Sequence, residues 1–271
     1  MRSAGRQADD SEWPEQAARV GLVAYGVVHL VLGWLSVQLA LGDREGSAST
    51  SGAVQELAQQ PFGSVLVWAV ALGMLLLVVW QGIEAAVGHT EETEDKKRIR
   101  KRVTSAGKAV IYAALGLSAV RTATGSGGGG GGSEKKTDSM TARLMDLPGG
   151  QVLVGLVAIG ILVVAGFLVH RGVTDGFLKK LDGGGRSGKD GTAYTWAGRI
   201  GYVAKGVALG VVGVLFGYAA ITHQSKKGGG LDQALHKVLE QPFGPVVLVA
   251  IGLGFACYGV FCFAWARHFD D

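Results

Sequence analysis

Charged residues are scarce in this sequence, and they are unevenly placed. Only 18% of the 271 residues are Asp, Glu, Lys or Arg, and 48% are hydrophobic, whereas a soluble domain carries about 25% charged residues. The charges gather in short segments, and the stretches between those segments are almost free of charge. This distribution argues against a soluble globular domain and indicates an integral membrane protein.

Cysteines are few in the sequence, and the common sequence motifs of enzymes are absent from it. Cys257 and Cys262 are the only two cysteines, and their five-residue spacing points them to different faces of a helix, which disfavours a disulfide or a metal site. The chain has no phosphate-binding loop, no Gly-x-Ser-x-Gly elbow, no His-Glu-x-x-His and no Cys-x-x-Cys. The sequence therefore predicts a protein that is not an enzyme and that has no catalytic residue, metal or cofactor.

Long apolar stretches are what the sequence does contain. Six of them reach or approach the length of about 20 residues that a helix needs to cross a bilayer. The predicted spans are residues 20–41, 62–87, 103–122, 152–170, 200–221 and 246–266. The third is the weakest, because its uncharged part lies between Lys108 and Arg121 and spans only if both side chains reach toward opposite interfaces.

The six spans form three copies of a two-helix unit. The first helix of each copy carries a glycine at the same register, namely Gly33, Gly116 and Gly213. The second helix follows a proline and carries a glycine twelve residues later, at Pro61 and Gly73, Pro148 and Gly160, and Pro242 and Gly254. Small residues let membrane helices approach closely, so we expect structural roles at these positions and helix contacts at Gly21, Gly26, Gly206 and Gly210.

The repeat defines the predicted fold class. We expect an all-α integral membrane protein of six transmembrane helices, arranged as three tandem hairpins with pseudo-threefold symmetry. Short amphipathic segments before each proline predict extracytoplasmic interfacial helices. The predicted segments are a tail at 1–18, hairpins at 19–90, 102–172 and 196–271, a basic loop at 91–101, a linker at 173–195 and a glycine-rich loop at 125–137 inside the second hairpin.

Lysine and arginine are distributed asymmetrically about the spans. The side that holds both termini carries about twice as many as the other side, and positive charge favours the cytoplasmic side. We therefore expect a multi-pass bacterial inner-membrane protein with both termini in the cytoplasm. The expected partners are the lipid bilayer, anionic headgroups at the cytoplasmic loops, and a membrane protein partner or further copies of the chain. The net charge of +4 is explained by this topology and not by nucleic acid.

The repeated motifs resemble a known family. Residues 19–33 and 199–213 correspond to one another, as do the Gln-Pro-Phe-Gly motifs at residues 60–63 and 241–244. Together they resemble the bacterial membrane family called domain of unknown function 1206, in which a two-span unit is repeated three times. The middle copy departs from the pattern, with Thr104 in place of a glycine. The resemblance implies the architecture and no activity, because the family carries no assigned activity.

Polar residues inside the spans are the candidates for a functional site. All lie within about two to three helical turns of the expected cytoplasmic boundary. The candidates for a ligand or proton site are Tyr25, His29, Gln81, Glu84, Lys108, Tyr112, His170 and Lys205. One interpretation is a polar vestibule facing the cytosol, in which Glu84 pairs with Lys108 or Lys205. The other is a set of helix-end anchors that reach the headgroups. Haem ligation by His29 and His170 is disfavoured, because neither has a histidine at equivalent repeat positions.

These residues leave two functions open. A structural or interaction protein is favoured, because few polar groups lie near the middle of the spans. The alternative is a small-solute or ion transporter or channel that uses the vestibule. A cavity reaching the middle of the membrane would favour the alternative, whereas a closed, glycine-packed bundle would favour the scaffold.

Overall fold

The computed structural model describes residues 4–42, 47–88, 95–125, 145, 149–178, 181, 188–222 and 230–268. This part of the chain contains eight α-helices and no β-strand: α1 (Ala4–Ala40), α2 (Thr50–Gln59), α3 (Gly63–Ala86), α4 (Asp95–Ala123), α6 (Gly150–Val173), α8 (Gly188–Thr222), α9 (Leu231–Leu239) and α10 (Gly244–Arg267). All but the short α2 and α9 are long and apolar enough to cross a membrane. The predicted six-span, all-α fold is therefore confirmed. Pro148 and most of the amphipathic segment predicted before it lie outside the described residues.

The short helices α2 and α9 lead into α3 and α10 through the repeated Gln-Pro-Phe-Gly turn. Phe62 and Phe243 take left-handed backbone conformations, with φ of 64° and 62°, and Gly149 does the same before α6. The glycine that ends each motif is needed for space, because a Cβ on Gly63 or Gly244 would collide with carbonyl oxygens at the end of the preceding short helix. The motif thus encodes a sharp turn that starts the second helix of the repeat.

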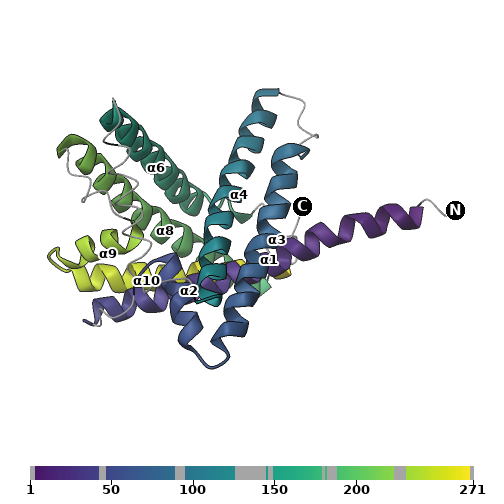
Figure 1. The fold of residues 1–271 in the computed structure, drawn as a ribbon, viewed down its shortest axis with the longest axis horizontal. Coiled ribbons are helices and arrows are strands. Elements are labelled where there is room, and N and C mark those ends of the chain that lie inside the picture. Colours follow the sequence, from purple (N-terminus) through teal and green to yellow (C-terminus); the bar gives the residue numbers. More distant parts are fainter. Residues whose placement is uncertain are drawn as a thin grey trace.

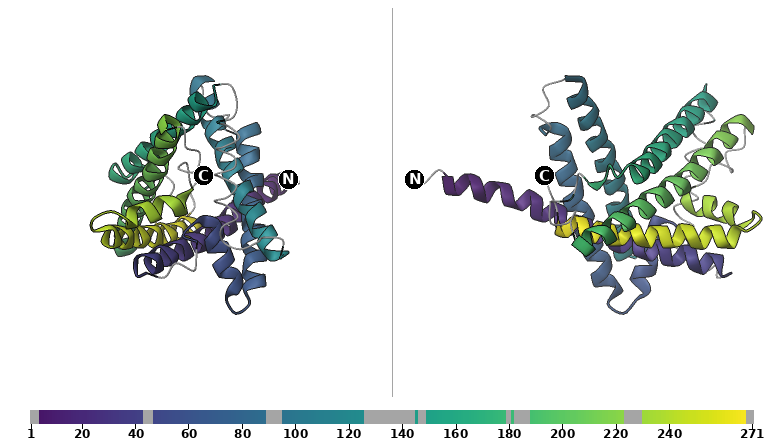
Figure 2. Two further views of the ribbon diagram at one scale, coloured as in Figure 1. Left: turned by 60° about the vertical axis from the view of Figure 1, so that its left-hand side comes forward. Right: turned by 180° about the vertical axis from the view of Figure 1, so that it is seen from behind.

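Each long helix packs most extensively on a helix of a different repeat. α3 of the first repeat packs on α4 of the second, α6 of the second packs on α8 of the third, and α10 of the third returns to α1 of the first. The left view of Figure 2 shows these three pairs as the sides of a triangle. The pseudo-threefold arrangement is therefore built from inter-repeat pairs, a partnership that the repeat pattern alone did not specify.

The repeat-equivalent glycines Gly33, Gly116 and Gly213 lie in these three interfaces. A methyl group added to any of them would come within 3.3 Å of the neighbouring repeat, where the nearest residues are Gly252, Met74 and Leu162, respectively. A side chain at these positions would therefore push the paired helices apart.

The α1–α10 interface brings the two backbones close together at four glycines. Gly26 and Gly33 on α1 face Gly259 and Gly252 on α10, and a methyl group on any of the four would lie 2.6 to 3.0 Å from a carbonyl oxygen of the facing glycine. Of the glycines expected at helix contacts, Gly26 thus lies in this tight interface. Gly21 meets α3 and Gly206 meets α6 closely, whereas an added methyl on Gly210 would only touch Ala165 at 3.9 Å.

Within a repeat, the two helices pack extensively in the first and third copies. Gly73 of α3 lies against Ala24 of α1, and Gly254 of α10 lies against Ala204 of α8 at the equivalent positions. In the middle copy α4 and α6 diverge (Figure 1), and a methyl group on Gly160 would have no atom within 4 Å. Gly160, for which a structural role was expected, therefore makes no close helix contact within the described part of the chain, because α6 diverges from α4 there.

In the second and third repeats, an arginine near the start of the membrane-spanning part of the first helix bonds to the preceding repeat. Arg199 of α8 donates two hydrogen bonds, of 2.6 and 2.5 Å, to the carboxylate of Asp175 just beyond α6. Arg102 of α4 donates to the carbonyl oxygen of Gly88, at the equivalent place beyond α3, over 3.2 Å. The hydrogen bonds from Arg199 lower the pKa of Asp175, so this ion pair is present throughout the neutral range.

Replacing Gly33 with Leu should destabilise the protein, because the new side chain needs space that the backbone of Gly252 occupies. We expect a loss of about 1–3 kcal/mol, seen as a lower melting temperature of the detergent-purified protein. The matched control is Gly82→Leu on α3, where an added methyl group meets nothing within 4 Å. Equal melting temperatures for the two variants would contradict this account of the α1–α10 interface.

Candidate functional site

The side chain of Lys205 lies at the junction of the first and third repeats. Its neighbours in sequence fix the helix: Ala204 packs on Gly254 of α10, and Gly206 packs on α6. The Lys205 side chain turns toward α1, where its Nζ donates to the hydroxyl oxygen of Tyr25 over 2.6 Å and lies 3.2 Å from Nε2 of His29. The ammonium therefore lies inside the bundle, about 9 Å of helix beyond Arg199.

The tautomer of His29 follows from its two neighbours. Its Nδ1 lies 2.8 Å from the carbonyl oxygen of Tyr25, and a carbonyl oxygen only accepts hydrogen bonds, so Nδ1 carries the proton. In a neutral imidazole Nε2 is then an acceptor, and it accepts from Lys205. The histidine ring is 3% exposed, so both of its nitrogens are committed within the protein.

Aromatic rings enclose the ammonium. Its Nζ lies 4.2 Å from the ring centroid of Tyr258 on α10 and 4.8 Å from that of Tyr25, distances at which ring faces attract cations. Tyr112 of α4 stands edge-on to Tyr25 with centroids 5.4 Å apart. We call Tyr25, His29, Tyr112, Lys205 and Tyr258 the Lys205 cluster. It draws on α1, α4, α8 and α10, and thus on all three repeats.

Four of the eight candidates, Tyr25, His29, Tyr112 and Lys205, are brought together in this cluster. Of the two partners expected for Glu84, Lys205 binds Tyr25 and His29 instead, and the Glu84 carboxylate acts electrostatically on Lys108. Gln81 is 2% exposed, and its Oε1 has no hydrogen-bond partner among the described residues.

His170, by contrast, is exposed on α6. It belongs to a different helix pair from His29, and both ring nitrogens of His29 are already engaged within the Lys205 cluster. His29 and His170 therefore do not take part in the same cluster.

Tyr258 and the neighbouring Tyr202 were not among the candidates. Their rings meet edge-on with centroids 5.2 Å apart, and Tyr202 carries the guanidinium of Arg171 above its ring at 5.6 Å. The sequence held a usable signal, since Tyr258 replaces the apolar Leu77 and Val164 of the other repeats at the same register. A tyrosine in an otherwise apolar register thus marked the site.

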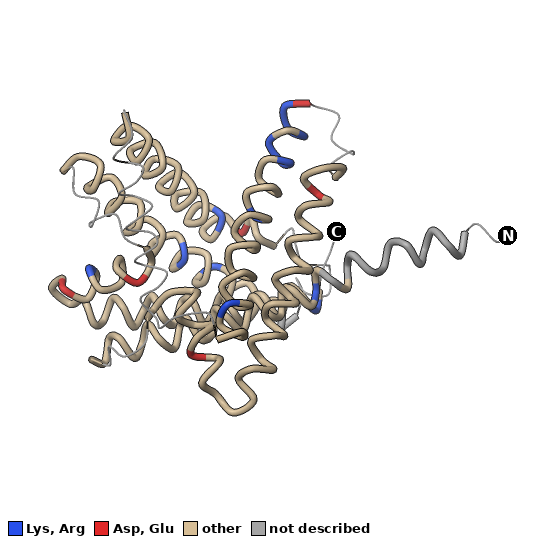
Figure 3. Tube along the Cα trace, in the orientation of Figure 1, with Lys and Arg blue, Asp and Glu red and all other residues tan. Residues whose placement is uncertain are grey.

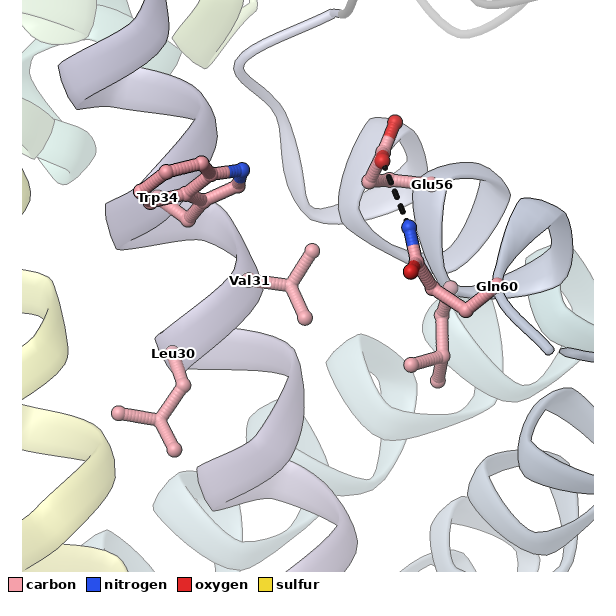
Figure 4. Close-up of a pocket in the computed structure, with 6 residues that line it drawn as sticks. Leu30, Val31, Trp34, Glu56 and Gln60 are labelled. Atoms are coloured by element: carbon pink, nitrogen blue, oxygen red, sulfur yellow. Dashed lines mark hydrogen bonds between the residues drawn. The ribbon is translucent and has the colours of Figure 1, made fainter.

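A pocket of about 500 Å³ lies elsewhere, between α1 and α2. Figure 4 shows Val31 of α1 pointing toward α2, at whose end Gln60 donates to Glu56 over 3.0 Å. The lining residues are Leu30, Val31, Trp34, Glu56, Leu57 and Gln60. None of them belongs to the Lys205 cluster, and the lining contains no cation.

Fold and site together define a class: a helical membrane protein of three two-helix repeats with a lysine-centred polar cluster between the repeats. The chain belongs to the family described as Domain of Unknown Function (DUF1206), whose profile matches residues 20–88, 103–175 and 200–268. These three segments correspond to the three repeats, which confirms the predicted family. The chain is also 27% identical over 249 residues to "Uncharacterized protein YxxB" of Bacillus subtilis (strain 168), across 92% of this chain and 89% of that protein. No solved structure matches.

The bond between Lys205 and Tyr25 is open to a double-mutant test. Tyr25→Phe removes the acceptor of a charged hydrogen bond and should cost about 1.5–3 kcal/mol, whereas Tyr218→Phe on α8, where the residue is 48% exposed, should change little. In a Lys205→Met background the effect of Tyr25→Phe should shrink, because the donor is gone. Strictly additive effects in detergent melting experiments would show that the two side chains do not interact.

Proposed function

We propose that the protein is a solute-binding membrane protein, whose Lys205 cluster binds an anionic group. The observation that carries this proposal is the set of partners of Lys205. Tyr25 and His29 take two of its three N–H groups, and in the described part of the chain no carboxylate lies within ion-pair distance of it. An ammonium inside a membrane span without a counter-charge is costly, and a bound anion would offset that cost.

The direction of the side chain supports binding over anchoring. A lysine that anchors a helix end extends its ammonium toward the headgroups. Lys205 instead directs its ammonium between α1 and α10, onto the rings of Tyr25 and Tyr258. These groups hold the cation in place and leave one donor for a ligand.

The charge distribution favours access from the side of the termini. Figure 3 shows basic residues gathered on the half of α4 where that helix begins, which the predicted topology assigns to the side of both termini. By the positive-inside rule this side faces the cytoplasm, so the proposal places both termini in the cytoplasm of a bacterial cell and the Lys205 cluster in the cytoplasmic half of the inner membrane. The proposed role is binding or passage, without a chemical step.

A scaffold role is the second candidate, and one observation favours it. Only 17% of the most apolar stretch of α4, and the same share of α6, is buried inside the protein, compared with 61% for α1. Helices with so much bare apolar surface offer contact area to a membrane protein partner or to another copy of the chain.

Anion binding can be measured on the purified protein. Melting temperatures would be recorded with rising chloride, acetate or inorganic phosphate at constant ionic strength. We expect at least one of these anions to raise the melting temperature with the logarithm of its concentration, and Lys205→Met to abolish the shift. Lys237→Met is the matched control, because Lys237 is an exposed lysine on α9.

A flux measurement then distinguishes transport from binding alone. Flux of the stabilising anion into proteoliposomes, above that into protein-free vesicles, would assign transport, and binding without flux would assign a receptor role. If every anion shifts wild type and Lys205→Met alike, the proposed anion site is wrong and the scaffold remains.

A further inference from the structure

The middle repeat exposes surfaces that the other two repeats bury. Ile111 on α4 is 56% exposed, whereas its repeat equivalents Val28 and Ala208 are 2% and 1% exposed. Val164 on α6 is 49% exposed, whereas its equivalents Leu77 and Tyr258 are 0% and 5% exposed. The first and third repeats thus show these faces covered. By comparison, the equivalent faces of α4 and α6 in the middle repeat lack a covering group among the described residues.

Two glycines lie within these bare faces. Gly107 precedes Ile111 by one helical turn on α4, and Gly160 precedes Val164 by one turn on α6, so each pair shares a face. Their equivalents in the first and third repeats are the Ala and Gly residues in contact there, but a methyl group on Gly107 or Gly160 would meet nothing within 4 Å. The Gly107 and Gly160 faces are therefore open, on two helices that diverge from one another in Figure 1.

Positive charge lies toward the terminal side of the same helices. Lys108, next to Gly107, is half-buried, and its charge interacts unfavourably with Arg171 of α6 and favourably with Glu84 of α3. The Nε of Arg171 is buried and has no hydrogen-bond partner among the residues that the structure describes. Together, Lys108, Arg171 and Glu84 carry one net positive charge, which lies toward the terminal side of the open glycine faces.

We propose that an anionic phospholipid, from the leaflet on the side of the termini, occupies the space between α4 and α6. Its phosphate binds Lys108 and Arg171, and an acyl chain runs along α6 from Arg171 toward Gly160, three turns deeper, and covers the Gly107 and Gly160 faces. This ligand matches both parts of the proposed site, because its phosphate suits the two cations and its acyl chain suits the apolar glycine faces. A second protein helix would cover the glycines but bring no anion, and closure of the hairpin would bury the faces while leaving the two cations unneutralised.

The test uses the full-length protein in detergent. Added phosphatidylglycerol should raise the melting temperature, and phosphatidylcholine or inorganic phosphate at equal concentration should not. Gly160→Leu should weaken the effect by filling the space, and the double variant Lys108→Gln/Arg171→Gln should weaken it by removing the phosphate ligands. Gly166→Leu is the matched control, because Gly166 is another open glycine of α6 that lies about 120° around the helix.

Three outcomes would overturn the proposal. Equal stabilisation by phosphate alone would indicate a free-anion site. A disulfide formed within one chain between Gly107→Cys and Gly160→Cys, in a variant lacking Cys257 and Cys262, would show that the hairpin closes on itself. A disulfide between two copies through Gly160→Cys would assign the face to a dimer. The proposal is independent of the Lys205 cluster, so Lys205→Met should keep the full phosphatidylglycerol effect.

Discussion

The structure depends on how closely α1 and α10 approach each other. Gly26 and Gly33 face Gly259 and Gly252, with carbonyl oxygens where side chains would otherwise stand. In a bilayer no hydrophobic force drives helices together, so such close backbone packing is a main source of helix association. This contact joins the first and last repeats, and without it the chain would be an open row of helix pairs rather than a closed triangle.

The polar cluster is a consequence of that closure. Tyr25 and His29 belong to the first repeat and Lys205 and Tyr258 to the third, so they meet only because α1 lies against α10 beside α8. Once there, the ammonium is held by a phenol, a neutral imidazole and two aromatic faces, all of which favour a cation without neutralising it. The arrangement leaves a positive charge that no carboxylate among the described residues neutralises, and this is the property from which the proposed anion binding follows.

Much of this was predictable from the sequence, for identifiable reasons. Helix number followed from apolar length, and repeat boundaries followed from Gly33, Gly116, Gly213 and their prolines. The gathering of Tyr25, His29, Tyr112 and Lys205 was anticipated, because all four are polar residues near the expected cytoplasmic ends of their spans. Which helices pair between repeats was not predictable, since a face of small residues does not show which helix will pack on it. Gly160 illustrates the limit: its register equals that of Gly254, yet one lies in open space and the other in a helix contact.

The central claim is that glycine packing of α1 on α10 places His29 against Lys205. The ¹⁵N spectrum of the histidine side chains in labelled protein tests it most directly, with the His29 signals identified by their loss in His29→Gln. The account predicts a protonated Nδ1 and an unprotonated, hydrogen-bonded Nε2, with the Nε2 resonance displaced both by Lys205→Met and by Gly33→Leu. An Nε2 resonance that neither substitution moves would contradict it.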